Sequence, residues 1–245
     1  MNYHWNWGIF GEQVKSGDET YLDWLLTGLG WTLAVSLTAW LLALAIGIAV
    51  GALRTTPSRL LVALGTAWVE LFRNVPLLVQ MFLWFFVVPE FLPRDWSLWV
   101  KQQMPAKEFI TAALCLGFFT SARVAEQLRA GITSLPRGQR HAALALGFTL
   151  PQAYRHVILP QALRIVIPPL TSEFMNVFKN SSVAFAIGVM ELTFQARQMQ
   201  EDSEQGIETY LAVTALYFIC AFAANRGMAW IEARTRVPGL IAKSG

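Results

Sequence analysis

The sequence is poor in the residues that build disulfide frameworks, metal sites and soluble surfaces. It holds two cysteines and three histidines in 245 residues, and only 14% of its residues are charged. Cys115 and Cys220 both lie inside apolar runs, so we expect them to be small buried hydrophobes. The three histidines, His4, His141 and His156, are too scattered in the sequence to suggest a metal site. The composition therefore favours neither a disulfide-stapled domain nor a metalloprotein.

Two kinds of functional segment are also missing. The N-terminal stretch, residues 1–19, lacks the basic n-region and apolar h-region of a signal peptide, so the first membrane span is expected to act as its own insertion signal. The sequence contains no G-x-x-x-x-G-K-[ST] motif, so we expect no nucleotide site in this chain. The net charge of +3 is too small to indicate binding to nucleic acid.

Apolar side chains dominate what is present. Hydrophobic residues make up 55% of the sequence and aromatic residues 13%, with ten tryptophans. A soluble domain of this length has too much surface to hide so much apolar side chain, whereas apolar runs of about 20 residues suit a lipid environment. Trp96 and Trp99 are placed as anchors at a membrane interface. The composition predicts an all-α polytopic membrane protein.

Five segments are predicted to cross the membrane as helices of about 20 residues or more. They are residues 24–53, 60–88, 108–130, 161–189 and 209–231. Pro76 interrupts the second span. The fourth is weaker, with Pro168 and Pro169 near its start and the polar run from Lys179 to Ser182 near its middle. Gly47 and Gly51 form a small-xxx-small pair. Glycine is common in membrane helices, and we favour that explanation over close helix packing.

The distribution of charge predicts the topology. Basic residues gather in the loops after the first and third spans and in the C-terminal tail: Arg54, Arg59, Arg129, Arg137, Arg140, Arg155, Arg234, Arg236 and Lys243. Acidic residues gather in the N-terminal segment and before the fifth span: Glu12, Asp18, Glu19, Asp23, Glu191, Glu201, Asp202, Glu204 and Glu208. Because positive charge collects on the cytoplasmic side, we expect the N-terminus outside and the C-terminus inside. This alternation requires an odd number of spans and therefore the weak fourth one.

The segment between the third and fourth spans, residues 131–160, is too hydrophilic to cross the membrane but is patterned for ordered structure. Residues 138–146 are rich in alanine and leucine and are predicted to form a helix, which Gly147 ends in a left-handed C-cap. Thr149 can then cap a second helix with Pro151 in its first turn. Such order in a cytoplasmic loop indicates a docking partner. A linker with incidental helices is the alternative.

This segment resembles the EAA loop of ABC-importer permeases, whose motif reads roughly E-A-A-x-x-x-G-x9-I-x-L-P. The positions that correspond to the motif are His141, Ala142, Ala143, Gly147, Leu159 and Pro160. In that family the loop forms the coupling helix, which sits in a groove of the cytoplasmic ATPase. His141 replaces the glutamate that a salt bridge to the ATPase would need, while the glycine turn and the helix packing are kept.

Two further stretches resemble signatures of the polar-amino-acid branch of these permeases. The run from Glu70 to Gln80 is similar to E-x-x-R-x-x-P-x-x-x-Q, and the run from Ser172 to Gly188 is similar to the branch's block in the fourth span. The resemblance covers residues 20–235 and is nearest to the glutamate/aspartate permeases.

The resemblance implies a type I ABC-importer transmembrane domain over residues 23–235, with a coupling loop at 131–160. A periplasmic segment, 1–22, precedes it and a cytoplasmic tail, 236–245, follows, in a bacterial inner membrane. The implied partners are a second permease subunit, homologous or identical, two cytoplasmic ATPase subunits and a periplasmic amino-acid-binding protein. The chain itself would be no enzyme and hold no cofactor, because ATP and Mg²⁺ would be bound by the ATPases. Its function would be to form the pathway for a polar amino acid, glutamate or aspartate.

Charged residues inside the predicted spans are costly to bury in lipid and are therefore candidates for the translocation pathway. Glu70 with Arg73, and Arg123 with Glu126, are three residues apart on a helix and can pair. Structural ion pairs between helices are an equally weighted alternative. The residues predicted to line the pathway are Glu70, Arg73, Arg123, Glu173, Lys179, Asn180 and Ser181.

Three other functions fit the sequence less well. A secondary amino-acid transporter without an ATPase is the main alternative, but such proteins usually have internal repeats and more spans. A membrane-embedded enzyme would need a nucleophile elbow, an H-E-x-x-H motif or an intramembrane pair of aspartates, and the sequence shows none of them. Nothing in the sequence resembles the selectivity filter of a channel.

Overall fold

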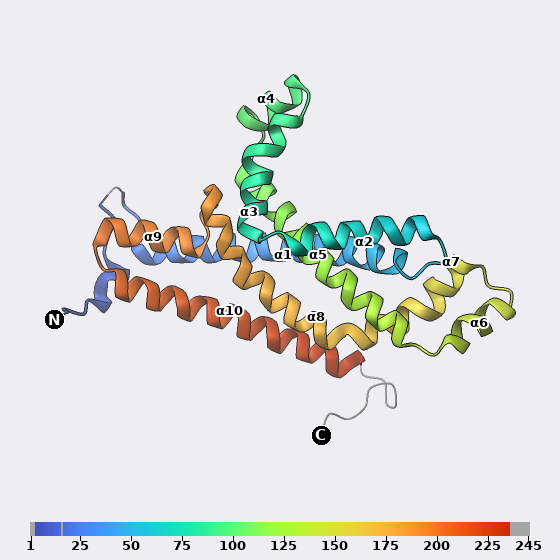
Figure 1. The fold of residues 1–245 in the computed structure, drawn as a ribbon. Coiled ribbons are helices and arrows are strands. Elements are labelled where there is room, and N and C mark those ends of the chain that lie inside the picture. The colour runs from blue at the N-terminus through green and yellow to red at the C-terminus, as the bar shows by residue number, and fades with distance from the viewer. Residues whose placement is uncertain (1–2, 16, 236–245) are drawn as a thin grey trace. The chain divides into compact units, whose positions relative to one another are not determined.

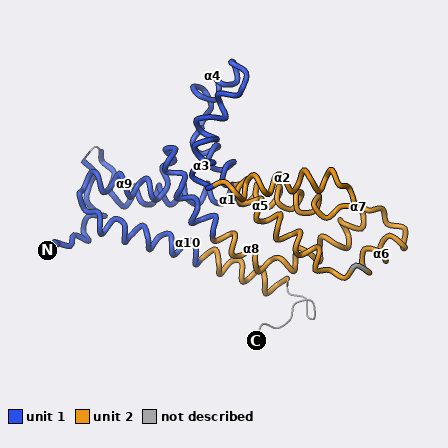
Figure 2. Tube along the Cα trace, in the orientation of Figure 1, with its two compact units in different colours: residues 1–39, 76–116, 176–222 blue, residues 40–75, 117–175, 223–245 orange. Residues whose placement is uncertain are grey.

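The computed structural model describes residues 3–15 and 17–235 and divides into two compact units (Figure 2). Unit 1 comprises the chain up to residue 39 with residues 76–116 and 176–222, and unit 2 comprises residues 40–75, 117–175 and the chain from residue 223. Residues 1, 2, 16 and 236–245 lie outside the described residues. The predicted cytoplasmic tail, with Arg236 and Lys243, falls among them.

Helices make up nearly all of the described chain (Figure 1). Among the residues described, the β-type pairing consists of one isolated bridge between Gln13 and Thr20. Four long helices each run from one unit into the other: α1 (Tyr21–Leu53), α5 (Lys107–Ser134), α8 (Leu159–Ser181) and α10 (Gly206–Thr235). The predicted all-α fold is confirmed.

Three of the long helices are both long and apolar enough to cross a membrane. They are α1, α5 and α10, each of which contains an 18-residue window with a mean hydropathy of 2.4, 1.3 and 1.7, respectively. A broken pair, residues 59–74 and 77–91, forms a fourth candidate span. The 23 residues of α8 are enough to cross a bilayer, but Arg164, Glu173 and Lys179 make it less apolar than these three. The helices agree with the prediction of about five spans, of which the fourth is the least apolar.

The predicted interruption of the second span is present. Helix α2 (Arg59–Asn74) is followed by Val75 in an extended conformation, with φ −101° and ψ 131°. The ring of Pro76 explains this, because it disfavours a helical conformation at the residue before it. Unit 1 then continues with α3 (Leu77–Phe82), the π-helical η2 (Leu83–Val87), the 3₁₀ helix η3 (Val88–Phe91) and α4 (Arg94–Gln102).

The acidic segment before the fifth span is helical, whereas the sequence indicated a loop. The 3₁₀ helix η5 (Ser182–Ile187) follows α8, and α9 (Leu192–Ser203) follows η5 in unit 1. The Glu191 side chain caps α9 by accepting hydrogen bonds from the backbone N–H groups of Thr193 and Phe194, both at 3.0 Å. An acidic N-cap suits the positive end of the helix dipole. The charges that indicated an outside loop are thus partly structural.

Glu191 and the residue after it also connect α9 to its neighbours in unit 1. Its side chain is completely buried, and burial raises the pKa of its carboxyl group. The hydroxyl of Tyr217, on α10, donates a hydrogen bond to this carboxyl group. The backbone N–H of Leu192 donates to Thr32 Oγ1, on α1, at 3.1 Å. The start of α9 is thereby held to both α1 and α10 within this unit.

Unit 2 contains a close contact between α1 and α5. A Cβ atom built on Gly47 would lie 2.6 Å from Val124 Cβ, and one on Gly51 would lie 2.8 Å from the carbonyl oxygen of Ala125. Side chains essentially never approach this closely, so only glycine fits at both positions. The explanation favoured from the sequence, that these glycines are merely common residues of membrane helices, is wrong.

Helix α5 also makes a close contact with α8 in unit 2. A Cβ on Gly131 would lie 2.5 Å from Val166 Cγ1. The sequence placed the end of the third span at Ala130, but α5 continues for another turn to Ser134. The extra turn brings residues of the predicted coupling loop into the helical packing.

Candidate functional site

The segment between α5 and α8 folds as its sequence predicts. It consists of α6 (Arg137–Ala145), α7 (Leu150–Ala153) and the π-helical η4 (Tyr154–Ile158), all in unit 2. Gly147 has a φ of +89°, in the left-handed region that the predicted C-cap requires. Its N–H donates to Leu144 O at 3.0 Å, and the N–H of Phe148 donates to Ala143 O at 3.2 Å. This pair of bonds is the Schellman motif, so the predicted helix end is confirmed.

The second helix of the segment begins at the predicted residue. The backbone N–H of Thr149 donates to Oε1 of Gln152 at 2.8 Å, and Pro151 lies in the first turn. Ala153 is fully buried behind this turn. Leu159 and Pro160, the last two motif positions, open α8.

Residues 137–158, called the coupling segment after the family motif that they resemble, present an apolar surface. Leu146 is 81% exposed, and Leu144 and Phe148 are about 40% exposed. His141 and Ala142 are also exposed, whereas Ala143 is buried. Large apolar side chains gathered on an exposed turn mark an interaction surface. The sequence predicted the order of this segment but did not single out these three side chains.

Glu126, on α5, holds two arginines within unit 2. Its carboxylate lies 2.5 Å from Nη1 of Arg54, directly after α1, and accepts a hydrogen bond of 3.1 Å from Nε of Arg129. The predicted pairing of Glu126 with Arg123 is wrong, because Arg54 and Arg129 occupy the carboxylate. Helix periodicity pointed to Arg123, whereas the actual partners come from the next turn of α5 and from α1.

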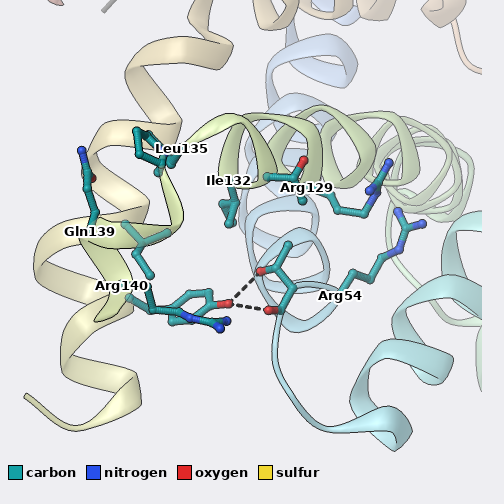
Figure 3. Close-up of a pocket in the computed structure, with 11 residues that line it drawn as sticks. Arg54, Arg129, Ile132, Leu135, Gln139 and Arg140 are labelled. Carbon is teal, nitrogen blue, oxygen red and sulfur yellow. Dashed lines mark hydrogen bonds between the residues drawn. The ribbon is translucent and has the colours of Figure 1, made fainter. Parts of the chain in front are cut away.

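A second contact joins the end of α1 to η4. The hydroxyl of Tyr154, in η4, donates to the backbone oxygen of Thr55 at 2.7 Å (Figure 3). The end of α1 is thus tied both to α5, through Arg54, and to the coupling segment, through Thr55. Nothing in the sequence singled out Tyr154 or Thr55, because the contact joins segments far apart in the chain.

Arg123 has a different acidic partner. Its Nη1 lies 3.7 Å from Glu173 on α8, and its guanidinium group lies 4.8 Å from the ring centroid of Phe119. Nε2 of Gln127 donates to the same carboxylate at 3.3 Å. Two of the residues predicted to line the pathway, Arg123 and Glu173, are therefore brought together in unit 2.

The other predicted pathway residues are placed separately. Glu70 and Arg73 are exposed on α2, and no ion pair joins them in the described part of the chain. Lys179, Asn180 and Ser181 end α8 and belong to unit 1. Lys179 is exposed, whereas Ser181 is completely buried and donates to its own helix. The expected pairing of Glu70 with Arg73 is wrong.

These features agree with comparisons to known proteins. The chain belongs to the family described as binding-protein-dependent transport system inner membrane component, which matches residues 43–237. It is a multi-pass inner-membrane protein of the permease class and not an enzyme.

Among its relatives, the chain is 47% identical to the glutamate/aspartate import permease protein GltJ of Escherichia coli strain K12, over 98% of both chains. It is 31% identical to the glutamate/aspartate import permease protein GltK of E. coli O6:H1, over 87% of this chain and 94% of GltK. A crystal structure of an amino acid ABC transporter with histidines matches with a TM-score of 0.73 and 29% identity, over 87% of this chain and 95% of that one. The predicted ABC permease is confirmed, and a secondary transporter is not supported.

Proposed function

We propose that this chain is a permease subunit of an ATP-driven importer and forms part of the pathway for glutamate and aspartate. The observation that carries the proposal is the 47% identity to GltJ over nearly the whole of both chains. The Schellman turn at Gly147 and the exposed Leu146 support it, because they form an ordered docking surface outside the predicted spans.

The second permease is proposed to be a homologous, unlike chain. In E. coli the name glutamate/aspartate import permease is carried by two proteins, GltJ and GltK, and this chain is 47% identical to the first and 31% identical to the second. That difference favours a GltJ-type chain paired with a GltK-type one. Two cytoplasmic ATPase subunits would bind ATP and Mg²⁺, and a periplasmic amino-acid-binding protein would deliver the substrate.

The orientation is proposed from the charges. Arg54, Arg129, Arg140 and the coupling segment would face the cytoplasm, and the acidic N-terminal segment and α9 would face the periplasm. The transmembrane domain would run from residue 23 to residue 235. Closure of the ATPases would move the coupling segment and switch the helices from inward- to outward-facing.

Coupling is proposed to use the motif positions together with the apolar surface around them. Leu144, Leu146 and Phe148 would enter the groove of the ATPase, while the left-handed turn at Gly147 fixes their direction. His141 is exposed next to this surface and would contact the ATPase without the carboxylate that the family motif supplies.

A transport assay tests the proposed substrate. The chain, a GltK-type permease, the ATPase and the binding protein would be reconstituted in proteoliposomes, with ATP supplied to the ATPase side. We expect ATP-dependent uptake of labelled glutamate and aspartate, and ATP hydrolysis stimulated by loaded binding protein. Lysine and glutamine serve as controls. Uptake of a neutral or basic amino acid in preference to glutamate and aspartate would contradict the proposal.

The pathway residues are proposed to contact substrate at mid-depth, where transporter sites usually lie. The basic members are Arg73, Arg123 and Lys179. A dicarboxylate amino acid carries a net negative charge, so its site needs at least one basic side chain that is not already paired with an acidic one. We expect Arg123→Ala to lower uptake most, about ten-fold, because it also removes the ion-pair partner of Glu173. Arg73→Ala and Lys179→Ala should each give a smaller loss.

Arg164→Ala is the matched control, since Arg164 is an exposed arginine of α8 outside the predicted set. Each variant is first checked for assembly with the ATPase by co-purification. Normal uptake by all three pathway variants would show that these cations do not serve the substrate.

A further inference from the structure

A cavity of about 270 Å³ lies in unit 2, next to the coupling segment (Figure 3). Its walls come from the residues directly after α1, from the last turns of α5 and from α6 and η4. The polar lining is rich in arginine: Arg54, Thr55, Arg129, Thr133, Gln139, Arg140 and Tyr154. The proposed translocation residues do not line it, so this cavity is separate from that proposed site.

The cavity carries an excess of positive charge. Three arginines line it, and no acidic residue is among the described residues of its lining. Glu126 lies behind the wall and pairs with Arg54 and Arg129, which leaves two of the three positive charges uncompensated. Arg140 has no ion pair to a described residue. A site of this charge attracts an anion.

Two buried polar atoms of the lining also lack partners. Nε of Arg54 and Oε1 of Gln139 are both inaccessible and make no hydrogen bond to a described residue. The Arg54 side chain is only 11% exposed. Buried donors without an acceptor are rare in proteins, because each one costs desolvation energy. Rotation of the Gln139 amide would present its NH₂ group instead of its oxygen, so the Gln139 side chain can supply a donor at this wall.

The chemistry of the lining favours a phosphate over an amino acid. A free amino acid carries an ammonium group, and the described lining offers it no carboxylate. Arginine guanidinium groups match the oxygens of a phosphate, whereas the Thr55 and Tyr154 hydroxyls of the same wall already donate to backbone oxygens. The apolar side chains of Ile132, Leu135 and Ile158 complete the cavity and suit a glycerol backbone and the first methylene groups of an acyl chain.

The position of the cavity in the chain indicates where the phosphate comes from. Arg54 follows Leu53, the last residue of α1, and Arg129 and Ile132 lie in the last turns of α5. Both helices are long and apolar enough to span the membrane, so the residues at their ends would lie at the depth of the lipid headgroups. Basic pockets between membrane helices at this level suit anionic headgroups.

We propose that this cavity is a phosphate-binding site and that an anionic phospholipid supplies the phosphate through its headgroup. The bound headgroup would join the end of α1 to α5 and α6, because Arg54, Arg129 and Arg140 come from these three elements. The coupling segment would then be sensitive to the anionic-lipid content of the membrane.

Lipid binding to the purified importer complex tests the proposal. The delipidated complex in detergent is incubated with radiolabelled phosphatidylglycerol or phosphatidylcholine, and the bound lipid is counted after gel filtration. We expect phosphatidylglycerol to bind preferentially. Arg140→Gln should lower its affinity about ten-fold, as loss of one charge-assisted contact does. Gln139→Glu, which keeps the shape of the side chain but adds a negative charge to the wall, should lower it at least as much.

Arg155→Gln is the matched control, because Arg155 is exposed in η4 and does not line the cavity. Its affinity for phosphatidylglycerol should equal that of the parent protein, and each variant must elute as a single assembled complex. Competition by excess inorganic phosphate separates the two sources. Displacement of the lipid by phosphate supports phosphate as the recognised group. If phosphate binds but the variants leave lipid binding unchanged, the phosphate does not come from a lipid headgroup.

Two results would overturn the site itself. One is equal retention of both lipids by the parent protein and every variant, together with no binding of inorganic phosphate. The other is release of the ATPase by Arg140→Gln while lipid binding stays unchanged, which would assign the basic cavity to a protein contact.

Discussion

Replacing Gly47 with leucine is expected to prevent the folded transporter from accumulating. The Cβ of any side chain at residue 47 would lie 2.6 Å from Val124 Cβ and 2.9 Å from the carbonyl oxygen of Ser121. Neither atom is the end of a flexible side chain, so α1 and α5 would have to separate. Overpacking by a few methylene groups costs about 1–3 kcal/mol, and a collision with backbone lies at or above the upper end of that range. Uptake and the yield of monodisperse protein should both be lost.

A graded series makes this prediction specific. Gly47→Ala adds the same Cβ without further atoms and should give a smaller loss of thermal stability, measured by gel filtration after heating in detergent. Gly30→Leu is the control in the same helix, because no atom lies within 4 Å of a Cβ built on Gly30. The expected order of stability is parent and Gly30→Leu, then Gly47→Ala, then Gly47→Leu. Equal stability of Gly30→Leu and Gly47→Leu would show that the close contact is not needed.

The coupling segment could be predicted residue by residue because its signals are local. The left-handed C-cap at Gly147 involves residues between Ala143 and Phe148, and the cap at Thr149 involves Gln152, three residues further on. Turn chemistry of this kind acts within one or two turns of helix, so it can be predicted from the residue types at neighbouring positions. The break at Pro76 is predictable for the same reason, because the proline ring restricts its own backbone and that of the residue before it.

The contacts between helices could not be predicted in the same way. The periodicity of α1 reveals that Gly47 and Gly51 share a face but not that α5 covers it. Glu126 was given the wrong partner because helix periodicity allows Arg123 and Arg129 equally and reveals nothing of Arg54. Arg54 precedes Glu126 by 72 residues, and only tertiary packing brings them together. In a membrane protein, hydropathy determines which segments enter the lipid. Which charged residues pair depends on which helices pack against each other.

Glu191 has both a charge that indicates the topology and a structural role in the fold. Its charge contributes to the acidic segment that indicated the outside of the membrane. Its burial and its bonds to the N-terminus of α9 give it a structural role as well. Counting the acidic residues of a loop assumes that every carboxylate is solvated. The count therefore did not reveal the helix that Glu191 caps.

Glu126→Gln is expected to destabilise the protein by about 3 kcal/mol, because it removes the single carboxylate that pairs two arginines. Arg54 is the more sensitive partner, since its side chain is 11% exposed while that of Arg129 is 36% exposed. Arg129 can turn toward water, whereas Arg54 would keep an uncompensated charge in a largely buried place. Unfolding in a denaturing-detergent titration measures the loss.

A double variant separates charge compensation from shape. Arg54→Gln combined with Glu126→Gln removes both buried charges and should recover most of the stability lost in Glu126→Gln alone. Glu201→Gln is the control for a surface pair, because Arg197 and Glu201 are each more than 60% exposed, and it should have no measurable effect. If the double variant is no more stable than Glu126→Gln, the cost lies in the lost contacts of Glu126 rather than in the unpaired charge of Arg54. Recovery would mean that charge compensation holds the end of α1 to α5. In that case an anion bound at Arg54 and Arg129 can alter the contact between the two helices.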